Sequence, residues 1–263
     1  MLQIERISKT FFPGTVNERR ALNEISLTLE QGDFVTIIGS NGAGKSTLLN
    51  AISGRYSVDS GTIDIAGNRV NKLKEHQRAK YVGRVFQDPM AGTAPDLTIE
   101  QNLALAVRRG KSRGLGPALT RGQRDRFRED LKSLELGLEN RLTAKVGLLS
   151  GGQRQALSLL MAGFTSPDIL LLDEHTAALD PQRAALVTDL TGRIVGQGGL
   201  TTLMVTHNME QALALGNRLI MMHEGRIVFS ADPERKKTLT VAGLLEEFSK
   251  IKGAQLDDRA LLS

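Results

Sequence analysis

The feature that most constrains the fold of this chain is a glycine-rich loop between an apolar run and an amphipathic segment. The loop matches the pattern G-x-x-x-x-G-K-[ST] in full and consists of Gly39, Ser40, Asn41, Gly42, Ala43, Gly44, Lys45, Ser46 and Thr47. Residues 34–38 before it are nearly all apolar, as expected of a strand buried on both faces. Leu48, Leu49 and Ile52 after it share one helical face. Strand, loop and helix form the front half of a βα unit and predict an α/β fold.

This loop has the residue types that bind a nucleoside triphosphate. Its glycines let the backbone wrap closely, so that N–H groups point inward at phosphate oxygens. The helix that starts near Lys45 adds its positive N-terminal end. Lys45 supplies a cation for the β- and γ-phosphates, and Ser46 supplies a hydroxyl to Mg²⁺. The alternative is a chance glycine-rich turn, which the flanking strand and helix argue against.

Two further strand-like runs end in polar, titratable residues. Residues 169–172 lead directly into Asp173 and Glu174, and residues 203–206 lead into His207. Because ligands of open α/β sheets bind at the carboxyl ends of the strands, we expect these side chains to lie beside the glycine loop. There Asp173 would hold Mg²⁺ through water. Glu174 would polarise a water molecule for in-line attack on the γ-phosphorus.

The rest of the sequence predicts additional strands and a helical insertion. Leu2 and Ile4, and then alternate residues over 25–29, have the apolar period of a half-buried strand. Residues 89–164 are richer in helical pattern, and we expect them to form a subdomain inserted into one domain that spans residues 1–235.

The end of the chain predicts a hairpin followed by a tail. Residues 219–222 and 226–229 are apolar runs on either side of a Glu-Gly turn signal. The tail, residues 236–263, is short and contains an amphipathic helix whose apolar residues are Val241, Leu244, Leu245 and Phe248.

Composition excludes several classes of function. The chain has no cysteine, which removes disulfides, thiolate metal sites and cysteine nucleophiles. No apolar run approaches the roughly 18 residues that a membrane-spanning helix needs. Residues 1–10 have neither the apolar core nor the cleavage site of a secretory signal. We therefore expect the chain neither to span a membrane nor to be exported by this route.

A basic stretch over residues 108–128 adds a possible anionic partner. Its members are Arg108, Arg109, Lys111, Arg113, Arg121, Arg124, Arg126 and Arg128. Nucleic acid or anionic lipid would be the functional interpretation. The favoured interpretation is a solvated surface, with Asp125, Glu129 and Asp130 as local counter-charges. Base stacking has little support, because Phe127 is the one aromatic residue among these charges.

A second glycine motif, residues 149–153, precedes a helical run and has Ser150 as a good N-cap. Alone, it indicates an ordinary capped helix. In order along the chain, however, the glycine loop, this motif and the acidic pair resemble the nucleotide-binding subunit of ATP-binding cassette (ABC) transporters. The resemblance covers roughly residues 1–232. Gln87 matches the Q-loop of that family, Asp180 its D-loop and His207 its switch histidine.

The resemblance implies a fold and a set of ligands. The fold is a P-loop NTPase core with a mostly parallel sheet, an antiparallel β subdomain and an inserted α-helical subdomain. ATP and Mg²⁺ are the implied cofactors, with Ser46, Asp173 and Gln87 at the metal. Phe11 lies nearest the place where the family stacks an aromatic ring on adenine, with Phe12 as the second choice. A core aromatic is the alternative for either ring.

The resemblance also implies an arrangement of two subunits. In similar proteins two copies pair head to tail, and each nucleotide lies between the glycine loop of one copy and the signature helix of the other. Ser150 and Gly152 would then contact the γ-phosphate across the dimer, and Asp180 joins them in nucleotide binding. Gln87 would sense Mg²⁺ and couple to a permease, and His207 would contact the γ-phosphate.

One residue departs from the family pattern. His175 follows the acidic pair where the family usually has proline. The run over residues 173–181 looks like a branch of stand-alone ATPases that serve uptake systems for amino-acid-type or uncharacterised solutes. A metal site at His175 is the less favoured hypothesis, because His76 and His223 show no ligand spacing to it. Local packing or a polar contact near the dimer seam is favoured.

The expected function is ATP hydrolysis that powers a separate transmembrane permease. Import of a small solute is favoured over export. The implied partners are a second copy of the chain, permease subunits and a solute-binding protein, without nucleic acid. The implied location is the cytoplasmic face of the cell membrane, where the chain would be peripheral. An ABC ATPase of translation or repair is less favoured, because this chain has one cassette and no long heptad run. A regulator without turnover is disfavoured by Glu174 and His207.

Overall fold

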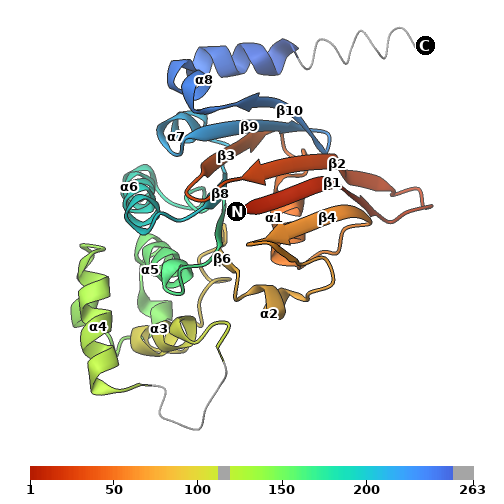
Figure 1. Ribbon diagram of the computed structural model, residues 1–263. Helices are drawn as coiled ribbons and strands as arrows, with labels where there is room; N and C mark the ends of the chain where they lie inside the picture. Colours follow the sequence, from red (N-terminus) through yellow and green to blue (C-terminus); the bar gives the residue numbers. More distant parts are fainter. Residues whose placement is uncertain (112–118, 251–263) are drawn as a thin grey trace, which may run out of the picture.

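A mostly parallel six-stranded sheet forms the centre of the computed structural model, which describes residues 1–111 and 119–250 (Figure 1). Its strand order is β10 (Arg226–Ala231), β9 (Arg218–His223), β3 (Phe34–Gly39), β8 (Thr202–Val205), β7 (Ile169–Asp173) and β6 (Val82–Val85). Neighbouring strands from β9 to β6 run parallel, and β10 pairs antiparallel with β9. The predicted buried strands and the C-terminal hairpin are confirmed.

A second sheet is antiparallel and comes mainly from the N-terminal part of the chain. Its order is β2 (Arg19–Leu29), β1 (Leu2–Phe11), β4 (Ser60–Ile65) and β5 (Asn68–Arg69). The alternating apolar residues predicted for β1 and β2 are buried, among them Leu2, Ile4 and Leu29. The antiparallel part of the predicted fold class is therefore confirmed.

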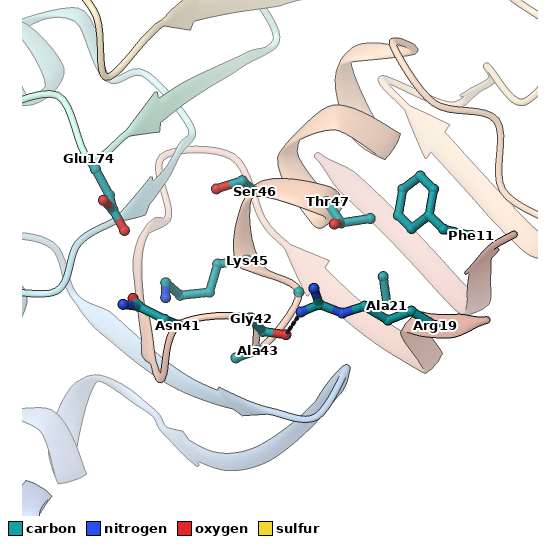
Figure 2. Close-up of a pocket in the computed structure, with 11 residues that line it drawn as sticks. Phe11, Arg19, Ala21, Asn41, Gly42, Ala43, Lys45, Ser46, Thr47 and Glu174 are labelled. Carbon is teal, nitrogen blue, oxygen red and sulfur yellow. Dashed lines mark hydrogen bonds between the residues drawn. The ribbon is translucent and has the colours of Figure 1, made fainter. Parts of the chain in front are cut away.

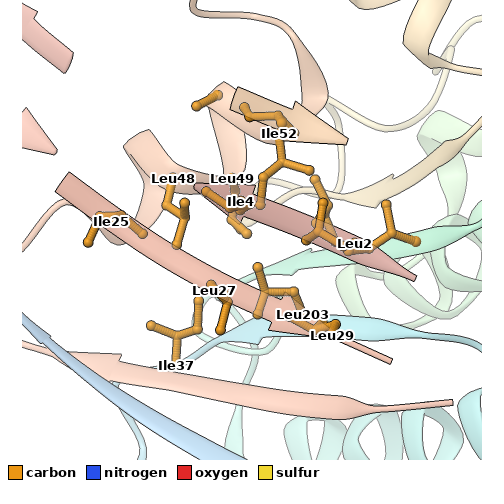
Figure 3. Packing of buried hydrophobic residues seen from close by; sticks show 14 of the residues in the cluster. Leu2, Ile4, Ile25, Leu27, Leu29, Ile37, Leu48, Leu49, Ile52 and Leu203 are labelled. Atoms are coloured by element: carbon orange, nitrogen blue, oxygen red, sulfur yellow. The ribbon is translucent and has the colours of Figure 1, made fainter. Parts of the chain in front are cut away.

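Helix α1 (Lys45–Ser53) lies between the two sheets and connects them through the main core. Figure 3 shows Leu48, Leu49 and Ile52 of this helix close to Ile4 of β1, with Ile37 of β3 and other aliphatic side chains below them. All of these side chains are essentially inaccessible to solvent. Because this packing fixes α1 between two sheets, it also fixes the glycine loop that leads into the helix.

A group of helices lies on the other side of the parallel sheet, away from β1 and β2 (Figure 1). It contains α3 (Ile99–Val107), α4 (Arg121–Lys132), two short 3₁₀ helices (Leu138–Asn140 and Val146–Leu148) and α5 (Gly151–Gly163). These helices share a core with the sheet, in which Leu103, Phe127 and Leu157 are fully buried. The predicted helical insertion is confirmed as part of the fold, while the boundaries at residues 89, 164 and 235 stay predictions.

The remaining helices surround the sheet: α2 (Glu75–Arg78), α6 (Pro181–Gly198), α7 (Met209–Ala214) and α8 (Pro233–Thr238), followed by helical residues 241–250. Leu244 is buried in a small core with β9 and β10, as the amphipathic pattern predicts. The prediction for Leu245 is wrong, because its side chain is 52% exposed. The tail from residue 251 onward lies outside the described residues.

The basic stretch is only partly a solvated surface. Arg109 departs from the favoured interpretation, because its Nη2 donates to the carbonyl oxygens of Met161, at 3.2 Å, and Ala162, at 2.7 Å. Three other arginines of the stretch form ion pairs: Arg124 with Glu100, Arg126 with Asp130 and Arg128 with Asp125. Arg113 lies outside the described residues. Within residues 1–111 and 119–250, none of the helices combines the length and the apolar character that a bilayer crossing requires.

Candidate active site

The three motif-bearing strands of the parallel sheet are in register at Val205, where β7 and β8 end and β3 continues to Gly39. Val205 of β8 pairs with Ile37 of β3 on one side and with Asp173 of β7 on the other. The glycine loop, the acidic pair and His207 therefore leave the sheet at one edge. This is the edge at which parallel α/β sheets bind ligands.

The backbone of the glycine loop is pressed against neighbouring strands. A Cβ atom on Gly39 would lie 2.1 Å from the carbonyl oxygen of Met222 on β9. A Cβ atom on Gly44, which has a φ of 99°, would lie 2.3 Å from the carbonyl oxygen of Ala21 on β2. Only glycine fits either position without moving backbone. The loop is thus held by sheet contacts on two sides.

Lys45 is buried inside the loop that it follows. Its Nζ donates hydrogen bonds to the carbonyl oxygens of Gly39, at 2.8 Å, and Ser40, at 3.1 Å. Burial lowers the pKa of Lys45, while the nearby carboxylates of Glu174 and Asp173 act in the opposite direction. The ammonium group is therefore held at the centre of the loop, with Asp173 and Glu174 close enough to favour its charge.

Ser46 and Asp173 form the oxygen pair predicted for the metal. The Ser46 hydroxyl donates to Oδ1 of Asp173 at 3.2 Å. The other carboxylate oxygen, Oδ2, accepts from Arg84 of β6 at 2.9 Å. Gln87, the third predicted metal ligand, is exposed and does not line the cavity described below.

Glu174 has an unusual backbone conformation for a residue with a side chain. Its φ is 43°, in the left-handed region, and its N–H donates to the carbonyl oxygen of Val205 at 3.0 Å. Such strained conformations persist where the surrounding structure enforces them, and they cluster at active sites. Oε2 of Glu174 lies 3.6 Å from Nδ1 of His207, whose side chain is 60% exposed. The carboxylate is thus placed between His207 and the glycine loop.

A cavity of about 330 Å³ opens over this loop (Figure 2). Its lining residues are Phe11, Arg19, Ala21, Asn41, Gly42, Ala43, Gly44, Lys45, Ser46, Thr47 and Glu174. Figure 2 shows Glu174 at one end and the Phe11 ring at the other, with Lys45 between them. Phe12 does not line the cavity and is 67% exposed. The geometry therefore favours Phe11 over Phe12 as the aromatic residue beside a bound base.

Two arginines in the site were not predicted from the sequence. Arg19 lines the cavity and donates from Nη2 to the carbonyl oxygen of Gly42 at 2.8 Å (Figure 2). Arg84 pairs with Asp173. A charged residue inside a short buried strand was the available signal for Arg84. For Arg19 there was none, because β2 approaches the loop only in the folded chain.

The signature motif caps a helix as predicted. Ser150 is the N-cap of α5: its hydroxyl accepts from the Gln153 N–H at 3.3 Å, and the Gln153 side chain accepts from the Ser150 N–H at 3.2 Å. Asp180 caps α6 in the same way, through the Arg183 N–H at 3.1 Å. Ser150, Gly152 and Asp180 do not line the cavity of their own chain. Their contact with nucleotide across a dimer stays a prediction.

His175 is fully buried beneath the acidic pair, and its Nε2 lies 2.9 Å from the hydroxyl of Thr191 on α6. The Thr191 hydroxyl proton is donated to the carbonyl oxygen of Val187 at 2.7 Å. Nε2 must therefore carry the imidazole proton and donate to Thr191. Burial lowers the pKa of His175 to about 4, so the ring is neutral. Among the described residues there is no cluster of three or more carboxylate, imidazole or thiol side chains that could hold a metal.

Comparison with known proteins agrees with these motifs. A sequence profile of the family described as ABC transporter matches residues 22–177. The chain is 47% identical over 249 residues to the tyrosine transport ATP-binding protein of Clostridioides difficile (strain R20291), covering 94% of this chain and 98% of that protein. It is 35% identical over 231 residues to the lipoprotein-releasing system ATP-binding protein LolD 1 of Caulobacter vibrioides, covering 86% of this chain and 94% of that protein.

The fold is also shared with a solved nucleotide complex. The ATP-binding cassette MJ0796, solved as a dimer in a post-hydrolysis state with ADP and Pi, is 30% identical to this chain. The two superpose with a TM-score of 0.75 over 89% of this chain and 99% of that one. The chain therefore belongs to the ABC transporter family, as an ATP-binding subunit that hydrolyses ATP.

Proposed function

We propose that this subunit works as a Mg²⁺-dependent homodimer that powers the import of an amino-acid-type solute through a separate permease. The observation that carries the proposal is the register of β3, β8 and β7 at Val205, which brings Lys45, Ser46, Asp173 and Glu174 to one edge of the sheet. A phosphate-binding lysine, a pair of metal-binding oxygens and a candidate base are the groups that hydrolysis of ATP requires.

The residues at this edge fit a magnesium ion. Mg²⁺ prefers hard oxygen ligands, and the Ser46 hydroxyl and Asp173 Oδ1 lie 3.2 Å apart. These two groups would hold the ion directly or through water, with Gln87 as the proposed third ligand. When bound, the ion neutralises charge on the β- and γ-phosphates. Lys45 supports the same phosphates from inside the loop.

Glu174 is the proposed general base for the attacking water. Its carboxylate lines the phosphate cavity and is held there by the backbone contact to Val205. The proton of the water passes to a Glu174 oxygen as the water oxygen attacks the γ-phosphorus. The bond from that phosphorus to the oxygen that bridges it to the β-phosphate breaks, and ADP and inorganic phosphate leave. His207, 3.6 Å from Oε2 of Glu174, is the proposed contact of the γ-phosphate.

A second copy of the chain would complete the site. Ser150 and Gly152 stand at the N-terminus of α5, and the positive end of a helix favours an anion. They lie outside the cavity of their own chain, which is consistent with a role toward the nucleotide of a partner. The dimeric state of the MJ0796 cassette supports this arrangement.

A groove of about 910 Å³ beside α2 and α3 is the proposed contact for the permease. Its lining combines apolar Leu97, Ala104 and Leu105 with basic Lys80 and Arg108. Leu105 is 55% exposed and lines the same groove as Leu97 and Ala104, and a contiguous apolar surface of this kind is typical of an interaction site. We propose that an amphipathic permease segment with acidic residues binds here, and that the subunit is thereby peripheral at the cytoplasmic face of the membrane.

The proposed cargo follows from the more similar of the two named relatives. The 47% identical relative is named for tyrosine transport, which supports an amino-acid-type solute, and a solute-binding protein would deliver it. A second candidate is release of a lipid-linked cargo, supported by the 35% identical relative of a lipoprotein-releasing system.

Import of an amino acid and release of a lipoprotein can both be measured in cells. A strain that lacks the subunit is complemented with the parent chain or with Lys45→Ala, and uptake of labelled tyrosine and other amino acids is measured. The proposal expects uptake with the parent alone. Equal uptake by all strains, together with a lipoprotein-release defect in the strain that lacks the subunit, would replace import with the second candidate.

Hydrolysis by the purified chain tests the assigned roles. Glu174→Gln should keep ATP binding and lower turnover by roughly 10²–10⁴-fold, because the amide cannot accept a proton from water. Lys45→Ala should lose nucleotide affinity, measured by calorimetry. Turnover of Glu174→Gln within threefold of the parent would demote Glu174 to an orienting role.

A further inference from the structure

Strand β6 has one charged residue, Arg84, and its side chain is only 9% exposed. Its Nη2 donates to Oδ2 of Asp173 at 2.9 Å, and the Asp173 side chain is itself 12% exposed. Because both groups are shielded from solvent, the pair is unlike a surface ion pair, whose geometry is loose and screened. The ion pair therefore restricts the orientation of the carboxylate.

The two oxygens of Asp173 have different partners. Oδ1 accepts from the Ser46 hydroxyl at 3.2 Å, on the side proposed for the metal, and Oδ2 accepts from Arg84. A carboxylate fixed by one oxygen presents the other in a fixed direction. Groups that bond to a metal ligand in this way orient the ligand and raise metal affinity.

The rest of the guanidinium is fixed by helix α1 and by an aromatic ring. Nη1 of Arg84 donates to Oδ1 of Asn50 at 2.7 Å and to the Ser53 hydroxyl at 3.2 Å. The guanidinium carbon lies 4.7 Å from the centre of the Phe86 ring. The buried Nε has no hydrogen-bond partner within residues 1–111 and 119–250. The two amino groups and the ring therefore determine where the guanidinium lies.

Phe86 connects this arrangement to the helical side of the molecule. Its carbonyl oxygen accepts from Nε2 of Gln155, a fully buried residue of the signature helix α5, at 3.1 Å. Phe86 also directly precedes Gln87. A continuous set of contacts thus runs from α5 through Phe86 and Arg84 to Asp173.

From these contacts we infer that Arg84 is a positioning residue for the magnesium site: it holds Oδ2 of Asp173 so that Oδ1 faces the metal. The inference rests on the proposed Mg²⁺ role of Asp173. The planar fork of arginine is needed, because one group must reach Asp173 and Asn50 at once while its face lies on Phe86.

Metal binding without turnover provides the test. Mn²⁺ is titrated into the chain in the presence of a non-hydrolysable ATP analogue, and free Mn²⁺ is measured by electron paramagnetic resonance. Binding of the same analogue in excess EDTA is measured separately. The variants are Arg84→Met and Arg84→Lys. The matched control is Arg69→Met, which removes an arginine from an ion pair with Asp64 in which Arg69 is 61% exposed.

Arg84→Met should weaken Mn²⁺ binding on the order of 10-fold, the lower end of the range for partners of metal ligands. Arg84→Lys should lose less, because its ammonium group reaches Asp173 but cannot also fork to Asn50. Analogue binding in EDTA should stay within about twofold of the parent in both variants, and Arg69→Met should match the parent throughout.

Three results would overturn the inference. The first is Mn²⁺ affinity within twofold of the parent in a folded Arg84→Met chain. The second is an equal loss of Mn²⁺ binding and of metal-free analogue binding, which would indicate a general structural role. The third applies if neither Arg84 variant folds. Asn50→Ala, which frees one end of the guanidinium, is then tested in their place, and a Mn²⁺ affinity equal to that of the parent would overturn the inference. A parent chain that binds no Mn²⁺ beside the analogue would instead refute the proposed magnesium site.

Discussion

His175 makes the stability of this chain depend on pH in a way that can be calculated. The imidazole is neutral in the folded chain, donates to Thr191 and has a pKa of about 4, against the ordinary value of 6.5. In the unfolded chain the ring is solvated and returns to the ordinary value. Between these two values the unfolded state binds more protons than the folded state, so the free energy of unfolding falls as pH falls.

The size of the effect follows from the two pKa values. The stability that depends on a neutral His175 is almost fully present at pH 7, above the unfolded value, and is lost as pH decreases toward 4. Proton linkage with a pKa of 6.5 in the unfolded chain and about 4 in the folded chain lowers the free energy of unfolding by about 2 kcal/mol between pH 7 and pH 5. That loss is a large fraction of the roughly 5–15 kcal/mol that stabilises a typical domain.

Chemical denaturation at pH 7 and pH 5 measures this loss. His175→Gln keeps a side-chain N–H for Thr191 but does not titrate, so the parent should lose about 2 kcal/mol more than the variant between the two pH values. Any constant effect of the new side-chain shape cancels in the comparison. His76→Gln, which removes an exposed imidazole from α2, is the matched control. If parent and His175→Gln lose equal stability, His175 is not the buried neutral donor described above.

Three further changes test the nucleotide site. Phe11→Ala should weaken ATP binding by roughly 1 kcal/mol or more, as loss of an aromatic stacking partner does, whereas Phe12→Ala should match the parent; calorimetry that finds equal affinities would remove Phe11 from the base site. Ser150→Arg should leave ATP binding by the monomer intact and abolish an ATP-dependent dimer in light scattering; a normal dimer would contradict the head-to-tail arrangement. Gly39→Ala should lose nucleotide binding and lower the melting temperature, because its Cβ would lie 2.1 Å from a β9 carbonyl oxygen. The control Gly122→Ala, which adds a Cβ in open space on α4, should leave nucleotide binding and the melting temperature unchanged. A normal melting curve for Gly39→Ala would refute the close approach of Gly39 to β9.

Strands β3, β7 and β8 of the parallel sheet were predictable because they are nearly continuous apolar runs, and the site was predictable because the motifs follow those runs directly. Strand β6 was not predicted, because it is four residues long and contains Gly83 and Arg84. The strands at residues 34–38 and 169–172 could be predicted without knowing the tertiary structure, because a strand buried on both faces has no alternation of apolar and polar residues. Arg19 and Arg84 could not be found in this way. Each acts on a loop or acid far away in sequence, through a contact that exists only after β2 or β6 has docked.

The N-terminal strands and the tail show a second limit. β1 and β2 extend well beyond their alternating residues through register shifts, with positive φ at Arg6 and Glu24. Such bulges interrupt the period of two that identifies a strand in sequence. Leu245 fits a helical apolar face but is exposed, whereas Leu244 is buried in the small core beneath that helix and Phe248 packs against this core. The spacing of apolar residues along a helix does not by itself specify how much of the apolar face is buried.

Val205 pairs with both β3 and β7, and this has a consequence for how the chain tolerates substitutions in its core. The lateral positions of the glycine loop, the acidic pair and His207 are set by main-chain hydrogen bonds across β3, β8 and β7. Strands in such a ladder keep a spacing of about 4.8 Å whatever aliphatic side chains they bear. We therefore expect that exchanging one buried aliphatic residue for a smaller one, such as Leu203→Val, lowers the melting temperature while the turnover number stays near that of the parent. Thermal tolerance and turnover number would then be adjustable independently, as a melting curve and a phosphate-release assay on the same variant would show.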